Sequence, residues 1–361
     1  MTTRRWARSC RVAVNTALGA TLVHRRSTPL RPTSLHTERM KTSRVDAREG
    51  TILATAVNLA NEAATGELVA ALRAAGHRAI VLKGPPLQRW LYGKTTRLSQ
   101  DVDILASWDR LAELEQVLAS VGWRYLGIDA VGEDRPHCRI WQRRDNGLVL
   151  ELHRNLAGIG VPAAEAWSII SAQTEEATVG ATMAEVLAAP ARAMHIALHA
   201  AQHGVAVART LTDLERALEL LPEEDWTHAA DLAARLEATD AFSAGLGLVP
   251  KGQELLQTLG LPPPSSTEAV LRAQGSPLGA DSLEWFTRLP DRRSKAKFLL
   301  RHLAPPRGYM CVWSGLARRG PLGLGLAYLW RPLWFLLHLG PAAASWRRAR
   351  RTVRAPRQEG S

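Results

Sequence analysis

Along the first half of the chain, short continuous apolar runs alternate with segments whose apolar residues recur at helical spacing. Apolar spacing and glycine stops predict helices, two of them within 50–75 and one each over 85–93 and 107–122. Short apolar runs and the turn residues Asp145-Asn146-Gly147 predict strands at 77–82, 101–105 and 123–126 and a hairpin over 139–154. Ser107 is the expected N-cap of its helix. This alternation predicts an α/β (α+β) core built on a mixed sheet.

The strand pattern disappears after Pro162, and residues 165–260 have the spacing of helices. We therefore expect a helical C-terminal domain after the α/β core. The expected segments are a basic N-terminus at 1–45 that is disordered or precedes a true start at Met40, an α/β domain at 46–160, helices at 161–260, a linker at 261–280, an apolar helical region at 281–346 and a basic tail at 347–361.

Two strongly apolar segments, 322–330 and 333–339, stand near the C-terminus. Arg331-Pro332 separates them, and Pro332 is expected to break the helix. Three interpretations stay open: a buried helix pair, peripheral membrane contact through 321–346, and a true span, which a central arginine disfavours.

Charge and cysteine content limit which kinds of partner and which cellular compartment are expected. The 361-residue chain has a formal net charge of +12, which indicates basic tails or an anionic partner: a nucleotide, an anionic membrane surface or, less favoured, a nucleic acid. The three cysteines form no CxxC pair or zinc spacing, and no small-residue cleavage site supports an export signal, so a cytoplasmic protein is expected.

Carboxylates on two predicted strands are the main candidate chemistry. Side chains alternate along a strand, so Asp101 and Asp103 share one face, as do Glu151 and His153 on the later hairpin. Hard carboxylate oxygens suit Mg²⁺, or Mn²⁺, with substrate phosphates as further ligands. We therefore expect Asp101, Asp103 and Glu151 to form one metal site.

A glycine turn precedes the first carboxylate strand. Gly84 would let the backbone approach a phosphate, and the following helix N-terminus favours anions. Lys83 and Arg97 are candidates for triphosphate contact, with surface ion pairs as the alternative.

Four further residues are candidates to line the acceptor site or support the carboxylates: His153, His199, His203 and Asp213. His195, His199 and His203 form a stripe on one helix face, for which packing is the alternative and zinc a minor one.

These motifs together resemble a known family. Leu82-Lys83-Gly84, Leu91-Tyr92-Gly93, Arg97, Asp101-Val102-Asp103 and Glu151-Leu152-His153 are similar to an uncharacterised bacterial branch of the nucleotidyltransferase superfamily. The resemblance covers roughly residues 50 to 340 and is strongest over 78–154. It implies a polymerase-β-like fold and transfer of a nucleoside monophosphate from an NTP to an unknown acceptor. The usual Gly-Ser turn is replaced by Lys83-Gly84-Pro85.

The leading hypothesis is an enzyme that uses two metal ions. Asp101 and Asp103 would hold the ion on the triphosphate, and Asp101 and Glu151 the ion that activates the acceptor hydroxyl. The alternatives are an inactive nucleotide-binding scaffold and a membrane-surface assembly partner.

Overall fold

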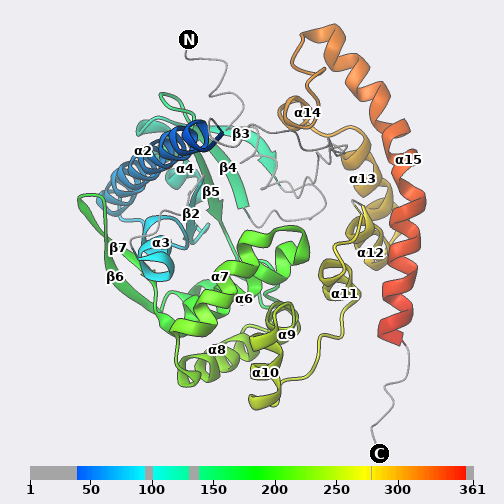
Figure 1. Cartoon of the computed structure of the whole chain (residues 1–361). Helices are drawn as coiled ribbons and strands as arrows, with labels where there is room; N and C mark the ends of the chain where they lie inside the picture. The colour runs from blue at the N-terminus through cyan, green and yellow to red at the C-terminus, as the bar shows by residue number, and fades with distance from the viewer. Residues whose placement is uncertain (1–38, 94–100, 130–137, 278, 355–361) are drawn as a thin grey trace, which may run out of the picture.

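One mixed, seven-stranded sheet forms the centre of the protein (Figure 1). The computed structural model describes residues 39–93, 101–129, 138–277 and 279–354. The strand order is β3-β4-β5-β2-β1-β7-β6. The strands are β1 (Ala79–Val81), β2 (Asp101–Ala106), β3 (Trp123–Asp129), β4 (Cys138–Arg143), β5 (Val149–His153), β6 (Thr174–Val179) and β7 (Thr182–Leu187). β2 is parallel to β5 and antiparallel to β1, and β1 is parallel to β7, which confirms the expected mixed sheet.

Helices pack on both faces of the sheet. On one face, α2 (Arg39–Ala74) and α4 (Leu111–Ser120) contribute apolar side chains that pack on Val102 and Ile104 of β2. On the other face, α3 (Pro85–Tyr92), α5 (Ala163–Ile170) and α6 (Ala189–His203) pack around Ile80 and Leu105. Because strand side chains alternate between faces, Asp101 and Asp103 project toward the α3/α6 side together with Leu105.

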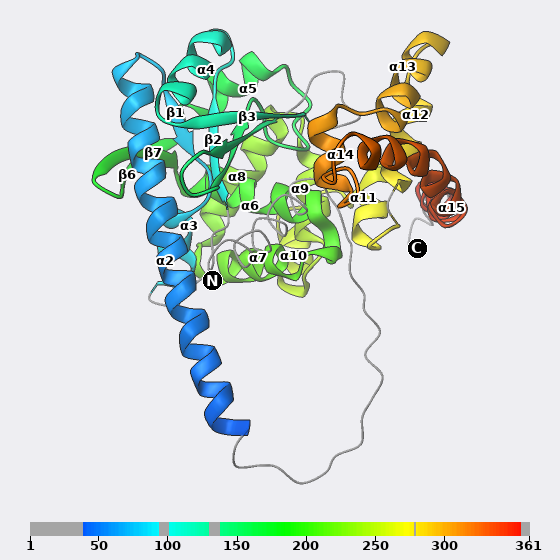
Figure 2. The same cartoon turned by 90° about the horizontal axis from the view of Figure 1, so that it is seen from above.

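The rest of the described chain is helical, as expected for the C-terminal region. The remaining helices are η1 (Gly204–Ala206), α7 (Ala208–Leu220), α8 (Glu223–Arg235), α9 (Thr239–Leu246), α10 (Pro250–Thr258), α11 (Thr267–Ala273), α12 (Ala280–Arg288), α13 (Arg292–Leu303), α14 (Arg307–Trp313) and α15 (Pro321–Arg354). Trp226 of α8 and Phe242 of α9 join the core that α6 shares with the sheet. Figure 2 shows α11 to α15 gathered on the side of the molecule opposite α2.

The expectation that strands end at Pro162 is wrong. Residues 174–187 form the β6–β7 hairpin, and β7 pairs with β1, so this hairpin completes one side of the sheet. The tight turn Gly180-Ala181 connects the two strands, and Gly180 has a φ of +59°, which favours glycine. Successive glutamates in β6 hide the alternation, because that edge strand is largely exposed.

Three further predictions of local structure are wrong. Residues 50–74 belong to one helix, α2, and Gly66 lies inside it, where a Cβ would be 2.6 Å from the Val179 carbonyl oxygen. Ser107 does not cap α4; its hydroxyl bonds the Asp109 carboxylate, and Arg110 occupies the N-cap position. The segment 261–280 contains helix α11, whose N-cap is Ser266.

Pro332 does not break the C-terminal helix. α15 continues through Pro332 and Pro341, both of which lie on exposed positions where water can bond the carbonyl groups that lose a donor. Among the described residues, α15 is the one helix with the length and apolar composition to cross a membrane, and 17% of its most apolar window is buried. It is therefore not the buried helix pair of the first interpretation.

Candidate active site

The adjacent parallel strands β2 and β5 bring the carboxylates together. Their register places Asp103 opposite Glu151, and Asp101 lies two residues earlier on the same face of β2. Asp103 is fully buried, Glu151 and His153 are buried, and Asp101 is partly exposed at the start of its strand. The predicted proximity of the two carboxylate strands is therefore present in the structure.

A lysine and a histidine contact the central carboxylate. Lys83, just after β1, donates from Nζ to Asp103 Oδ1 over 2.9 Å. His153 Nε2 lies 3.0 Å from the same oxygen and 3.5 Å from Glu151 Oε2. Asp103 Oδ2 is buried with no hydrogen-bond partner among the described residues. A buried carboxylate oxygen is costly without a donor or a cation.

The charges in the cluster shift one another's pKa values in opposite directions. Burial, and repulsion by Asp103 and Glu151, raise the pKa of Asp101 to about 7. Burial acts in the same direction on Asp103, but the ammonium of Lys83 and the bond from His153 outweigh it and lower its pKa well below the usual range. The cluster therefore keeps Asp103 ionised and makes Asp101 the carboxyl that accepts a proton near neutral pH.

The carboxylates raise the pKa values of the two basic side chains in the cluster, Lys83 and His153. Burial lowers the pKa of Lys83, but attraction by Asp103, Glu151 and Asp101 is stronger, so its pKa is raised. Burial also opposes the charged form of His153, while its bonds to Asp103 and Glu151 raise its pKa. Lys83 is therefore charged at neutral pH.

The glycine turn has the predicted place between strand and helix. Gly84 is the N-cap of α3 with φ +88° and ψ −143°, a conformation that side chains disfavour. Pro85 and Pro86 occupy the first turn of α3, where the missing N–H groups cost nothing. The N-terminus of α3 therefore opens beside Lys83 and the carboxylates.

The histidine stripe of α6 faces the same cluster. Burial, and then the charge of Lys83, lower the pKa of His195 to about 3 and that of His203 to about 4, so both rings are neutral at pH 7. The His199 ring lies 4.6 Å from the His203 ring and 6.1 Å from the His195 ring. Within the part of the chain that the structure describes, the group with metal-ligand geometry is Asp103, Glu151 and His153, so the zinc interpretation of the stripe has no support.

Asp213, the last of the candidate residues, lies on α7 and contacts α3. Its Oδ1 accepts a hydrogen bond of 2.5 Å from Tyr92 Oη at the end of α3, and the Arg216 guanidinium stacks 4.3 Å from the Tyr92 ring centre. Asp213 thus joins α7 to α3. Arg97 lies outside the described residues.

One residue that sequence reasoning missed is Arg209 at the start of α7. Its charge acts on both Asp101 and His203, so it lies near both the carboxylates and the histidine stripe. No local sequence signal distinguishes it from the other arginines, because only tertiary packing brings α7 to the sheet.

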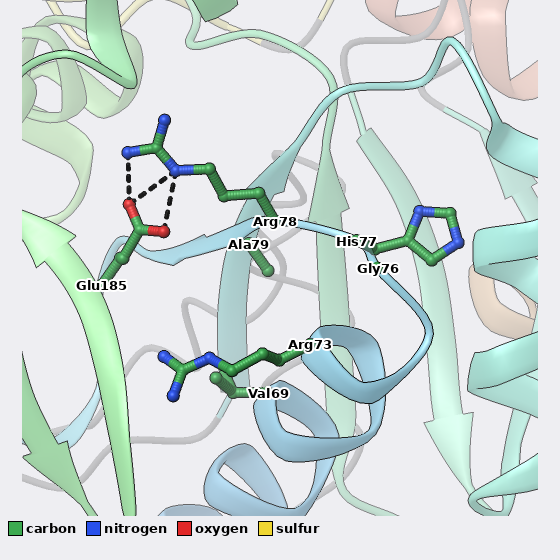
Figure 3. A pocket seen from close by; sticks show the side chains of 7 residues that line it. All are labelled: Val69, Arg73, Gly76, His77, Arg78, Ala79 and Glu185. Atoms are coloured by element: carbon green, nitrogen blue, oxygen red, sulfur yellow. Dashed lines mark hydrogen bonds and ion pairs between the residues drawn. The ribbon is translucent and has the colours of Figure 1, made fainter.

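A separate small cavity of about 260 Å³ lies at the opposite end of β1 (Figure 3). Arg78 beside it donates to both carboxylate oxygens of Glu185, and Arg73 donates to the Met183 carbonyl oxygen. None of the site carboxylates lines this cavity, and its arginines already have partners.

A buried carboxylate cluster on a mixed sheet, with a cationic glycine turn beside it, fits the nucleotidyltransferase class. Residues 4–251 match the sequence model of a family described as uncharacterised nucleotidyltransferase. The match spans more than half of the chain, so the chain belongs to this family and is a nucleotidyltransferase. The resemblance inferred from the sequence is thereby confirmed.

Solved structures and curated proteins add little beyond this family. A solution structure of the antibiotic-resistance factor ANT(2'')-Ia is 16% identical with a TM-score of 0.36, covering 51% of this chain and 94% of that chain. A crystal structure of ANT(2'')-Ia with adenylyl-2''-tobramycin is 17% identical with a TM-score of 0.34, covering 46% and 94%. These likenesses are too weak to bear on the substrate of this chain. Comparison with curated proteins gives no match.

Proposed function

We propose that the protein transfers a nucleoside monophosphate from an NTP to a hydroxyl acceptor with the help of divalent metal ions. The observation that carries the proposal is the buried pair Asp103 and Glu151, opposite each other on β2 and β5, with Asp101 on the same face. Charged groups are expensive to bury, so a cluster of three carboxylates beside one lysine favours the binding of further cations.

The side chains in this site are of the types that can coordinate a divalent metal ion. Asp103, Glu151 and His153 offer ligand atoms within 4.8 Å of one another, and Asp103 Oδ2 has no hydrogen-bond partner among the described residues. Carboxylate oxygens suit Mg²⁺, and the imidazole of His153 would make Mn²⁺ an acceptable substitute. Asp101, Asp103 and Glu151 would hold the ions. When bound, divalent ions neutralise charge on the phosphoryl oxygens and lower the pKa of an attacking hydroxyl.

The chain's own residues would bind and orient the triphosphate. Lys83 stays cationic and adjoins both the carboxylates and the N-terminus of α3, so it would attract phosphate oxygens. Gly84 keeps that approach free of a side chain.

The proposed reaction is a displacement at the α-phosphorus of the NTP. The acceptor oxygen forms a bond to the α-phosphorus, the bond between the α-phosphorus and the bridging oxygen breaks, and pyrophosphate leaves. The hydroxyl proton passes to a base or to water. The side of α6 that carries His199 and the neutral His203 would line the acceptor side of this site, and Arg209 would add positive charge there. The acceptor is defined only as a hydroxyl compound.

The test is transfer of label from each α-³²P-labelled NTP with Mg²⁺, Mn²⁺ or EDTA, using candidate acceptors and cell extract. We expect metal-dependent labelling that falls by at least about 100-fold in Asp103→Asn, because the central carboxylate is lost. Glu113→Gln, a change of the same kind at an exposed position of α4, should leave transfer unchanged. Equal transfer by wild type and Asp103→Asn, or transfer that persists in EDTA, would contradict the proposal.

A further inference from the structure

The outer face of α15 carries a continuous band of exposed apolar side chains. Leu322, Leu329 and Leu336 are 85%, 77% and 68% exposed, and Leu326 and Leu333 between them are also exposed. This spacing of three and four residues places all five on one side of the helix. Soluble proteins rarely leave so long an apolar surface without a partner.

The inner face of the same helix is fixed on the protein. Ala327 packs with Met310 and Ala317, and Ala342 packs with Leu271 of α11 and Ala280 of α12. Figure 1 shows α15 along the outer edge of the molecule, with α11 to α14 on its inner side. The apolar band is therefore the side of α15 that these neighbours leave uncovered.

Arg331 does not interrupt the band. Its guanidinium lies 5.0 Å from the Tyr309 ring centre, 4.7 Å from that of Trp313 and 5.1 Å from that of Phe335, and its Nε donates to the His302 carbonyl oxygen. These contacts bury the arginine on the inner face. A helix that spanned a bilayer would have to give up these contacts, so the geometry fits a helix lying parallel to a surface.

The stretch of sequence from 292 to 354, which contains the band, carries charged residues of one sign. Between residues 292 and 354 the chain contains fourteen arginines and lysines and no aspartate or glutamate. The formal charge of this segment therefore exceeds the formal net charge of the whole chain, which is +12. Arg318 and Arg319 precede α15, and Arg347, Arg348 and Arg351 lie near its end. An apolar band flanked by cations complements an anionic lipid surface, which offers acyl chains between negative headgroups.

A second copy of the chain fits this face less well. Two copies would bring together surfaces of the same sign, and the exposed part of α15 has no acidic residue to form ion pairs between helices. Trp330 and Leu337 also widen the band beyond the narrow seam of a coiled coil.

We propose that α15 and its basic flanks bind the surface of a membrane rich in anionic phospholipid, with the helix parallel to the surface and the leucine band in the interface. This proposal does not rest on the proposed catalytic mechanism.

The test is flotation of the purified full-length protein with phosphatidylcholine vesicles that contain either no or about 30% phosphatidylglycerol. We expect binding to the anionic vesicles to be at least about tenfold tighter, and to weaken at about 0.5 M NaCl as the charges are screened. Leu329→Gln/Leu336→Gln should weaken it at least about tenfold, since both side chains are largely exposed and can enter the lipid. Brominated phospholipid should quench tryptophan fluorescence, less so in Trp330→Phe.

A matched control comes from leucines of similar exposure elsewhere. Leu59 on α2 and Leu220 on α7 are 61% and 53% exposed, so Leu59→Gln/Leu220→Gln should bind vesicles as wild type does. Far-UV circular dichroism and thermal unfolding check that each variant is folded. No binding by wild type, or equal binding by the Leu329/Leu336 variant, overturns the proposal. Leucine-dependent dimers without vesicle binding would assign the band to a second copy, and salt-sensitive RNA binding without vesicle binding would assign the basic flanks to nucleic acid; both would overturn it.

Discussion

Replacement of Lys83 by methionine should destabilise the sheet in the absence of metal. The Lys83 ammonium is 2.9 Å from Asp103 Oδ1, the lysine side chain is 13% exposed and the aspartate side chain is fully buried. At an effective dielectric constant of about 20, two unit charges at this distance attract by ~6 kcal/mol. His153 and relaxation of the site offset part of this loss, so we expect the free energy of opening to fall by ~3–5 kcal/mol.

The assay is amide hydrogen exchange of β2 and β5, measured in EDTA so that no metal replaces the ammonium. Since 1.4 kcal/mol is a factor of ten, protection in both strands should fall by about two to nearly four orders of magnitude. Asp103→Asn in the Lys83→Met background should recover part of the loss, because it removes the uncompensated charge.

The matched control is Lys251, whose ion pair with Glu219 is more than half exposed on both sides. Lys251→Met should change protection by less than ~1 kcal/mol, the usual size for a surface pair. A loss of less than tenfold in Lys83→Met, or equal losses in both variants, would refute the argument that Lys83 is the buried counter-charge of Asp103.

Three further predictions test other parts of the structure. Mg²⁺ at about 100 times its Kd should raise the stability of wild type by ~2.7 kcal/mol in thermal unfolding, and the gain should vanish in Asp103→Asn/Glu151→Gln. Burial and the charge of Lys83 lower the folded-state pKa of His195 to about 3, below its unfolded value, so the stability that the neutral ring contributes is present above pH ~6.5 and is lost as pH falls toward 3. The free energy of unfolding, measured from pH 7 to 4, should therefore fall less steeply in His195→Met than in wild type. An unchanged slope would count against a buried neutral ring. Gly245→Ala should cost ~1–3 kcal/mol in urea unfolding, since its Cβ would stand 1.9 Å from the Ala197 carbonyl oxygen and force α6 and α9 apart, and a neutral effect would mean that the helices can separate freely.

Local sequence patterns predicted the part of the fold that local physics controls. β2, β5 and the β4–β5 hairpin follow from apolar alternation and a turn signal, and that alternation alone placed Asp101 and Asp103 on one face. The alternation around Glu151 and the turn before it led to the expectation that Glu151 lies on a strand near them. The register of Asp103 opposite Glu151 was beyond the sequence, because pairing of distant strands is decided by tertiary packing.

The errors arose where tertiary contacts override local pattern. Gly66 resembles a helix boundary until β6 packs against α2, and then it is the residue that lets the Val179 carbonyl approach. The β6–β7 hairpin had a signal in Gly180-Ala181, but consecutive glutamates on an exposed edge strand masked it. The contribution of Arg209 depends on where α7 packs, which no spacing within its own helix reveals.

The strand order has a consequence for how the protein is made. β1 pairs with β7, yet Val81 and Thr182 are separated by about a hundred residues, so one edge of β1 stays unpaired while that stretch is synthesised. At roughly 5–20 residues per second, the nascent chain leaves a buried-type apolar strand edge open for about 5–20 seconds. Unpaired edges attract other strands, so this interval is when the chain is most prone to mispairing and most in need of a chaperone.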